Sequence, residues 1–318
     1  MKSYETLTPL AAQNKTAVAL GYFDGVHLGH RAVLCAAVKA AKTQGLASAA
    51  FTFALPETGG FKGKRILSAD EKHRRIESLG IEHYIRPPFA AFCALSPEAF
   101  VRDLLQNTFG AKLVFCGADF TFGKDKAGDT ALLKTLCAAA DIGVCIVETA
   151  QYQGEVISST RIRTALAAGE IAAVNAMLGE DYCIDFPVRH GKAFGRTIGL
   201  PTLNQIYPTG MQIPKSGVYI TQVQRADGSV YAGATGLGTR PTVDGEDITC
   251  ETFLPDFSGD LYGERVRTRF CTYLKPTVKF SDKEQLKAYI QGAANAARAY
   301  FAASDKEREI GVDFHGML

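Results

Sequence analysis

The sequence lacks any pair of cysteines in a C-x-x-C arrangement, although eight cysteines are spread along its 318 residues. Zinc sites and redox sites commonly use such pairs, and disulfide frameworks are typical of short secreted chains. The cysteine spacing therefore argues against a zinc site and against a disulfide scaffold. We expect reduced thiols, most of them buried, in a cytoplasmic protein.

Membrane and export signals are also missing. No apolar run approaches the roughly 20 residues that a membrane-spanning helix needs. The first fifteen residues do not show the charged-then-apolar order of a signal peptide. The formal net charge is only +2, so we expect no general attraction to nucleic acid or to a membrane surface. A homo-oligomer is compatible with these features.

What the sequence does contain is an ordinary globular composition, with 47% hydrophobic and 21% charged residues. A chain of 318 residues exceeds the usual size of one domain, which favours two. In the first half, apolar runs alternate with helical patterns, and this order predicts a parallel sheet covered by helices. Ligands of such sheets bind at the carboxyl ends of the strands. The predicted strands are 17–20, 47–53, 82–85, 112–116 and 144–147. Helical patterns follow the turn at 24–30, the Ser-x-x-Glu capping box at 68–71 and the Ser-Pro pair at 96–97, and two more are expected at 130–140 and from 157–163 towards residue 168.

The pattern changes after residue 179. Short runs of alternating apolar and polar residues, among them 218–223 and 266–271, are typical of half-buried antiparallel strands. A closed or nearly closed barrel would remove the exposed edges of such strands. A helical pattern returns at 281–301, with Ser281 as the expected cap. The fold class that we expect is therefore α/β in the first half and an all-β barrel with a terminal helix in the second.

The stretch 17–34 carries the first chemical signal. An apolar strand ends at Gly21, a polar turn follows, and a helix begins near His27 and His30. This arrangement directs free backbone N–H groups and the positive end of a helix dipole towards a phosphate. The spacing G-x-F-D-G-x-H-x-G-H resembles the nucleotidyltransferase signature, and specifically the adenylyltransferase half of bacterial bifunctional riboflavin kinase/FAD synthetases. The resemblance implies catalytic roles for both histidines and nucleotide-binding roles for the surrounding turn, namely Gly21, Phe23, Asp24, Gly25 and Gly29.

Two later segments lie at equivalent strand ends. The segment G-A-D-F-T-F-G at 117–123 resembles the family's G-x-[ND]-F-x-F-G loop, which implies that Gly117, Asp119 and Phe120 line the substrate site. The segment I-S-S-T-R-I-R at 157–163 resembles the family's second nucleotide signature. Its hydroxyls and guanidinium groups would all donate hydrogen bonds to an anion. The implied residues are Ser159, Thr160 and Arg163.

The second half carries its own glycine-rich stretch at 191–204. It is no Walker motif, because no G-K-[ST] opens a helix. Taken alone, the stretch fits a basic loop between strands equally well. It resembles the riboflavin kinase signature G-x-x-x-G-R-x-x-G-x-P-T-x-N, in which the loop covers the ATP phosphates and Thr and Asn belong to the magnesium site. The resemblance implies phosphate binding by the loop and Mg²⁺ binding by its last two members: Gly191, Lys192, Gly195, Arg196, Gly199, Pro201, Thr202 and Asn204.

Further segments match the kinase family in the same order. The segment 238–242, which includes Thr239 and Arg240, resembles the G-T-R-P-T loop beside the flavin. Glu251 stands where the family has its catalytic glutamate, and 273–276 resembles the family's Y-L-R-P. Without these other matching segments, Glu251 would be interpreted as a surface carboxylate on a strand.

The resemblance runs from about residue 15 to about residue 301 and implies two domains, 1–180 and 181–318. It implies a riboflavin kinase that converts riboflavin to FMN, and an FMN adenylyltransferase that joins FMN to AMP, giving FAD and pyrophosphate. ATP is the implied co-substrate of both reactions, and Mg²⁺ the implied metal.

Several positions depart from the family pattern. Tyr22 stands where Asn is usual, Val156 where Arg is common, and the second strand lacks a frequent P-H-P histidine. In the kinase half, Phe253 replaces a frequent His and Gly236 a common Asn. Two alternatives therefore stay open: a riboflavin kinase whose adenylyltransferase half is weak or inactive, and a flavin- or nucleotide-binding protein without turnover.

Overall fold

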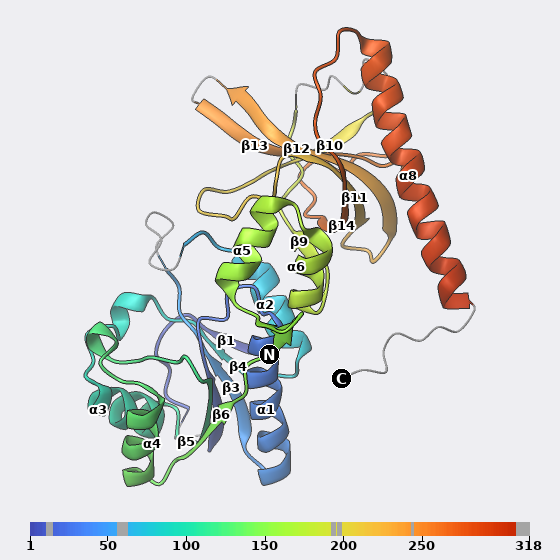
Figure 1. Cartoon of the computed structure of the whole chain (residues 1–318). Helices are drawn as coiled ribbons and strands as arrows, with labels where there is room; N and C mark the ends of the chain where they lie inside the picture. The colour runs from blue at the N-terminus through green and yellow to red at the C-terminus, as the bar shows by residue number, and fades with distance from the viewer. Residues whose placement is uncertain (11–14, 56–62, 192–194, 196–198, 243–244, 310–318) are drawn as a thin grey trace. The chain divides into compact units, whose positions relative to one another are not determined.

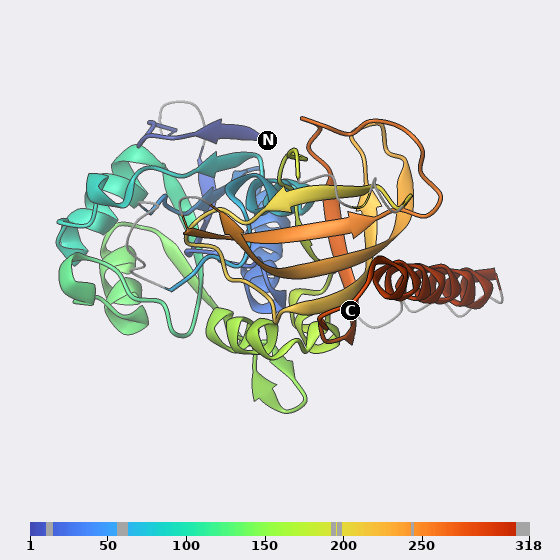
Figure 2. The same cartoon turned by 90° about the horizontal axis from the view of Figure 1, so that it is seen from above.

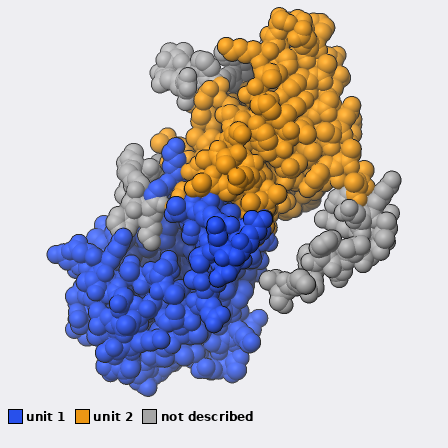
Figure 3. Space-filling model, in the orientation of Figure 1, with its two compact units in different colours: residues 1–162, 177–179 blue, residues 163–176, 180–318 orange. Residues whose placement is uncertain are grey.

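The computed structural model describes residues 1–10, 15–55, 63–191, 195, 199–242 and 245–309. They divide into two compact units, coloured separately in Figure 3. The first unit contains residues 1–162 and 177–179, and the second contains 163–176 and 180–318. The predicted domain boundary after residue 180 stays a prediction.

The first unit is built on a six-stranded parallel sheet with the order β1-β4-β3-β2-β5-β6 (Figure 1). The central strands β2 and β3 consist of small and apolar residues that are buried on both faces, as expected of a parallel sheet between helices. This confirms the α/β architecture predicted from the alternating pattern. The strands are β1 Lys2–Tyr4, β2 Thr16–Leu20, β3 Ala47–Phe51, β4 His83–Ile85, β5 Ala111–Gly117 and β6 Gly143–Val147.

The helices of this unit begin where the sequence places its capping residues. Ser68 accepts a hydrogen bond from the Glu71 N–H, so the predicted helix cap at Ser68 is confirmed. Ser96 and Pro97 open a helix that continues as a π-helix. The helices are α1 Leu28–Gln44, α2 Ala69–Ser78, α3 Pro97–Ala99, the π-helix η2 Phe100–Thr108 and α4 Thr130–Ala139, with short 3-10 turns η1 Phe89–Ala91 and η3 Lys124–Lys126.

The connection between the two sequence halves contains the helix expected to open at 157–163 and run towards residue 168, together with a hairpin and a second helix that the sequence did not reveal. A small hairpin is formed by β7 (Gln151–Tyr152) and β8 (Glu155–Val156). Two helices follow, α5 (Ser159–Ala168) and α6 (Ile171–Leu178). The boundary between the two units falls inside α5, after residue 162.

The second unit is a curved six-stranded antiparallel sheet with the order β10-β13-β12-β11-β14-β9 (Figures 1 and 2). Isolated bridges join Pro187 to Arg265 and Arg189 to Asn204, so the segment after β9 reaches β10 and brings the two edges of the sheet together. The predicted barrel-like all-β half is confirmed. Its strands are β9 Tyr182–Ile184, β10 Thr202–Ile206, β11 Gly217–Gln224, β12 Val230–Thr242, β13 Gly245–Phe253 and β14 Arg267–Lys275.

The inner face of this sheet contains polar residues that bond to one another. The Thr235 hydroxyl lies 2.7 Å from the Thr221 hydroxyl and 2.7 Å from that of Thr252, and all three side chains are fully buried. Gln205 donates to the carbonyls of Phe186 and Val266. These bonds satisfy buried polar groups and tie neighbouring strands together.

The terminal helix α8 (Lys283–Glu309) packs on β11 and β12 (Figures 1 and 2). Ala293, Ala294 and Ala297 form its buried stripe, because small residues allow close approach to the sheet. The expected cap was wrong by one residue: the helix begins at Lys283, and Asp282 accepts the hydrogen bond from the Gln285 N–H.

Candidate active sites

The turn after β2 holds an unusual backbone. Phe23, Gly25 and Val26 have φ angles of 54°, 88° and 48°. A left-handed conformation is uncommon for any residue with a side chain and is strained for β-branched Val26. Val26 is fully buried, so packing holds it in place. Strain of this kind, held by the surrounding fold, is a feature of functional sites.

Two glycines of the motif allow close packing at this turn. A Cβ atom on Gly21 would lie 2.7 Å from the Phe23 ring, and one on Gly29 would lie 3.2 Å from Cε1 of His27. The motif therefore needs glycine at Gly21 because no side chain fits there.

The two histidines lie together at the N-terminus of α1. Their rings stack at 3.6 Å between centroids with an angle of 21°, and His30 also meets the edge of the Phe23 ring. His27 is 6% exposed and caps the helix, its Nδ1 accepting from the His30 N–H at 3.4 Å. Burial lowers the pKa of His27 to about 4, although the charge of Asp119 raises it in part. At neutral pH the His27 ring is uncharged, and its proton is on Nε2 because Nδ1 accepts.

The loop after β5 contributes to the same edge of the sheet. The effect of Asp119 on His27 shows that this exposed carboxylate lies near the histidine pair. Gly117 has Asp119 folded against it, since a Cβ there would lie 3.1 Å from Oδ1. Phe120 and Phe122 stack at 6.0 Å in the same loop. The structure therefore brings the first two predicted segments together.

The third segment reaches the turn through Ser159. Its hydroxyl donates to the Asp24 carbonyl at 2.9 Å, and Asp24 also accepts from the Ile66 N–H through its side chain. The Thr160 side chain is exposed, and Arg163 lies half-buried further along α5. Ser159 thus supports the turn by donating to the backbone carbonyl of Asp24.

Arg161, between the two predicted donors, has a different task. Its Nη1 donates to the backbone carbonyls of Tyr152 at 3.0 Å and Glu155 at 2.8 Å, and its Nε lies 3.5 Å from Glu155 Oε2. Arg161 therefore clamps the β7–β8 hairpin. Val156, which stands where the family commonly has Arg, is 49% exposed on this hairpin.

The second candidate site lies on one face of β10, β13 and β12. Asn204 pairs directly with Glu251, and Glu251 pairs with Gly236. Directly opposed residues of antiparallel strands lie on the same face, and so do residues two apart on one strand. Thr202, Asn204 and Glu251 therefore share a face. Among the described residues, a Cβ on Gly236 would meet only the Glu251 carbonyl, at 3.9 Å, so the position opposite Glu251 on β12 is open.

Asn204 is the most constrained residue of this group. It is 6% exposed, and its Oδ1 is buried with no hydrogen-bond partner among the described residues. A Cβ on Gly191 would lie 2.4 Å from Asn204 Nδ2, so the amide packs directly on the Gly191 backbone. An acceptor oxygen that is buried without a donor is placed for a ligand that accepts lone pairs, such as a cation.

Other predicted residues of the glycine-rich stretch are placed in part. A Cβ on Gly195 would lie 2.3 Å from the Leu200 carbonyl oxygen, so there is no room for a side chain at this position. Gly199 has a φ of 74°, and Pro201 is exposed before β10. Thr239 is exposed on β12, and the backbone of Arg240 pairs with Asp247. Lys192, Arg196 and the side chain of Arg240 lie outside the described residues.

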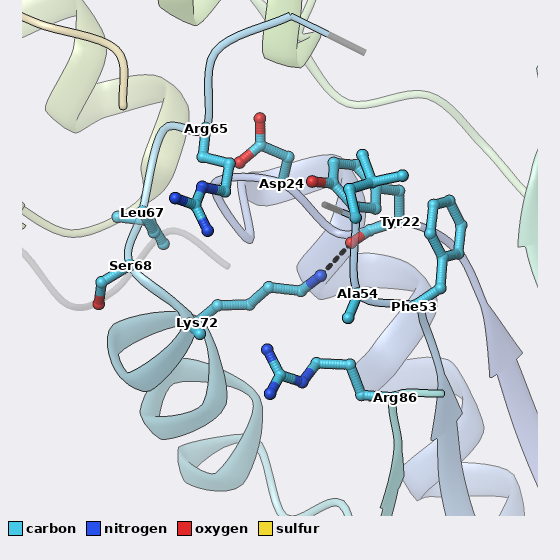
Figure 4. A pocket seen from close by; sticks show the side chains of 11 residues that line it. Tyr22, Asp24, Phe53, Ala54, Arg65, Leu67, Ser68, Lys72 and Arg86 are labelled. Carbon is cyan, nitrogen blue, oxygen red and sulfur yellow. Dashed lines mark hydrogen bonds between the residues drawn. The ribbon is translucent and has the colours of Figure 1, made fainter. Parts of the chain in front are cut away.

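The sequence did not reveal a cationic hollow near the first site. It lies at the carboxyl ends of β2, β3 and β4, and its lining includes Lys72, Arg86 and Tyr22 (Figure 4). Lys72 comes from α2, and Arg86 directly follows β4. The sequence signal for this hollow is weak. A basic residue after a short strand and a lysine one turn inside a capped helix are both common in proteins without any binding site.

Comparisons with known proteins cover both units. A family model described as FAD synthetase matches residues 10–161, and one described as riboflavin kinase matches residues 178–301. Several curated relatives are bifunctional riboflavin kinase/FMN adenylyltransferases. The protein of Haemophilus influenzae is 32% identical over 90% of this chain and 94% of its own. That of Bacillus subtilis is 33% identical over 91% and 94%, and that of Escherichia coli K12 is 33% identical over 92% and 94%.

A solved structure also resembles this chain over nearly its whole length. It is described as a macrolide-efflux protein from Streptococcus pneumoniae, with a TM-score of 0.83 and 29% identity over 93% of this chain and 98% of that one. In the part of this chain that the structure describes, no helix has the length and apolar character required to cross a membrane. Both sequence signatures, both folds and both family models agree, and the chain belongs to the family of bifunctional riboflavin kinase/FMN adenylyltransferases.

Proposed function

We propose that this chain makes FAD from riboflavin in two reactions, with one site in each unit. The second unit transfers the γ-phosphoryl group of ATP to riboflavin, giving FMN and ADP. The first unit joins FMN to the AMP part of a second ATP, giving FAD and pyrophosphate. The observation that carries the proposal is the pairing of buried Asn204 with exposed Glu251 on one face of the sheet.

In the kinase reaction Glu251 acts as the general base. Its side chain is exposed on the face that it shares with Thr202 and Asn204, where a substrate can reach it. It accepts the proton of the riboflavin 5′-hydroxyl while that oxygen attacks the γ-phosphorus. A general base typically contributes 10²–10⁴-fold to a rate. Positioning and neutralisation of charge supply the rest in phosphoryl transfer.

The residues at this face fit a magnesium ion. Mg²⁺ prefers oxygen ligands and is usually bound through one or two protein groups together with substrate phosphates. Asn204 offers a buried Oδ1 without a partner among the described residues, and Thr202 adds a hydroxyl on the same face. Among the same residues no group of three His, Cys, Asp or Glu side chains could hold a metal by itself. When bound, Mg²⁺ would offset negative charge on the ATP phosphates.

In the adenylyltransferase reaction the protein gathers anions. The phosphate of FMN is already charged, so it needs no protein nucleophile when it attacks the α-phosphorus of ATP. Neutral His27 offers its Nε2–H as a hydrogen-bond donor, and His30 lies stacked against it at the positive end of α1. A preorganised donor is typically worth about 3–4 kcal/mol to such a transition state. Ser159 and the motif glycines support the turn that holds the histidines.

A product assay tests both halves. Purified protein is incubated with riboflavin, ATP and Mg²⁺, and the flavins are separated by chromatography. We expect FMN and FAD from the wild-type chain. FMN alone would leave a riboflavin kinase with an inactive adenylyltransferase half, and unchanged riboflavin would leave a binding protein.

Two substitutions separate the sites. Glu251→Gln should slow FMN formation by roughly 10²–10⁴-fold while FAD formation from supplied FMN continues. His30→Ala should abolish FAD formation and spare FMN formation. Glu284→Gln, an exposed carboxylate on α8, is the matched control and should change neither rate. Equal loss of both activities in either site variant would contradict separate sites.

Localisation and assembly stay predictions. Cytoplasmic localisation is supported by the cysteines, of which all eight are unpaired and four are buried.

A further inference from the structure

The hollow beside the first site has an unusual lining. It is open to solvent on one side and lies where Tyr22, Phe53 and Arg86 follow the ends of β2, β3 and β4. The start of α2 closes its side with Ser68 and Lys72 (Figure 4). Parallel sheets bind ligands at this end of their strands. The roles given above to the two histidines do not involve the basic residues of this hollow.

Three cations extend into the hollow from separate segments. Figure 4 shows the side chains of Arg65, Lys72 and Arg86 approaching the same space. Lys72 is 9% exposed and donates to the Tyr22 carbonyl and, at 2.9 Å, to the Thr52 hydroxyl. Asp24 is the one acid among the described residues of the lining, and its side chain accepts from a backbone N–H.

Arg86, which lines the hollow, also has a buried donor. Its Nη2 lies 3.0 Å from both carboxylate oxygens of Glu5, which is 63% exposed. Its Nε is buried and has no hydrogen-bond partner among the described residues. Tyr84 adds a second such atom, its hydroxyl, close enough for the Arg86 charge to act on it. Unsatisfied buried donors of this kind are rare in native folds and call for a partner.

The balance of charge indicates what that partner is. Like charges that converge in a partly buried space repel one another unless a counter-ion joins them. Arginine forks and a lysine ammonium group are the side chains that bind phosphate groups. The described lining has three cations and one acid, Asp24, so it keeps a positive excess even with the exposed Glu5 paired to Arg86.

We propose that Arg65, Lys72 and Arg86 form an anion subsite for a phosphate group, separate in its residues from the histidine pair. The chemical class of the ligand is a phosphomonoester or a pyrophosphate. This assignment rests on the proposed function only for the identity of the reactant, which is either the phosphate of FMN or the polyphosphate of ATP. Binding of an inorganic phosphate compound does not depend on that function.

The direct test uses inorganic pyrophosphate in equilibrium dialysis without Mg²⁺. Arg86→Gln should weaken binding at one site about tenfold, because it removes a charge-assisted hydrogen bond. Glu5→Gln should strengthen binding severalfold, because it removes the carboxylate that competes for the guanidinium. Arg102→Gln is the control for net charge: Arg102 is 64% exposed in the same unit and pairs with Asp103, and its loss should leave binding unchanged.

The two substitutions are expected to change the pyrophosphate affinity in opposite directions, so misfolding cannot produce both results. A variant that fails to fold can lose binding, but it cannot gain it as Glu5→Gln should. Equal pyrophosphate affinity in the wild type, Arg86→Gln and Glu5→Gln would overturn the proposal. So would a change in Arg102→Gln as large as that in Arg86→Gln.

Initial rates of FAD formation then identify the reactant. A KM that rises for FMN in Arg86→Gln assigns the subsite to the phosphate of the acceptor, and one that rises for ATP assigns it to the polyphosphate. If the wild type makes no FAD, but Arg86→Gln weakens and Glu5→Gln strengthens pyrophosphate binding, the proposed function fails and the proposed subsite stands. If FAD forms and pyrophosphate binding ignores these charges, the subsite fails and the function stands.

Discussion

Gly191→Ala should disable the kinase site without touching the adenylyltransferase site. The new Cβ would lie 2.4 Å from Asn204 Nδ2, 2.9 Å from Cγ and 3.1 Å from Oδ1. Ordinary contact begins at 3.4 Å, so the amide must move by about 1 Å, a displacement that can cost on the order of 10²-fold when it affects a reacting geometry. The amide cannot swing away at low cost, because Asn204 is 6% exposed and its backbone is held in the strand by the bond that its main-chain carbonyl accepts from the Arg189 N–H.

The assay measures both rates in one preparation. FMN formation from riboflavin should fall about 100-fold, whereas FAD formation from supplied FMN should stay at the wild-type rate. Gly292→Ala is the matched control, since nothing lies within 4 Å of a Cβ at that position on α8. Wild-type kinase activity in Gly191→Ala would refute the role of the Asn204 amide. Equal loss of both activities would point to global unfolding, which thermal denaturation of the two variants can report independently.

Three further predictions concern stability. Because burial holds the folded pKa of His27 near 4, below the usual value of 6.5, the unfolded chain binds more protons between these values, and acidification through this window should cost about 3 kcal/mol. Urea unfolding from pH 7 to pH 4 measures this loss, which His27→Asn should remove while it keeps a cap. Thr235→Val leaves the hydroxyls of Thr221 and Thr252 without their shared partner and should lower the free energy of unfolding by about 1–3 kcal/mol, again measured in urea. Arg161→Met should release the β7–β8 hairpin and speed hydrogen exchange at its amides, with no change in the strands of the parallel sheet.

The first half of the fold could be predicted because its signals are local. Strands β2, β3 and β5 are apolar runs, and Ser68 and Ser96 cap helices by bonds to residues three positions on. The three-residue strand β1 was missed, since too few residues show a period. His83 on β4 is likewise only 5% exposed, with the Tyr4 hydroxyl bonded to it, and no local pattern indicates this burial.

The second half was harder because its strands are rich in glycine and threonine. Strand β12 contains Gly233, Gly236 and Gly238, which give no alternation of apolar and polar residues. The candidate kinase residues were nevertheless proposed from the sequence, because segments of fixed spacing hold Thr202 and Asn204 in one stretch and Glu251 in another. The cationic hollow was not found, since Lys72 and Arg86 come from different elements and only the fold brings them together.

The register of β10 against β13 brings together two residues of the candidate kinase site that are 47 positions apart in the sequence. Bonds on the opposite face of the sheet fix that register. Asn204 meets Glu251 only in the observed pairing of β10 with β13, and a slip by one residue would turn Glu251 to the other face. The next residue, Thr252, points inward and bonds to Thr235 on β12. A slip would bury the charge of Glu251 and expose that hydroxyl, so the bonds of the interior penalise the same error that would destroy the site. The polar interior of this sheet therefore supports the proposed kinase site by holding β13 in place, although its side chains lie on the opposite face from Glu251.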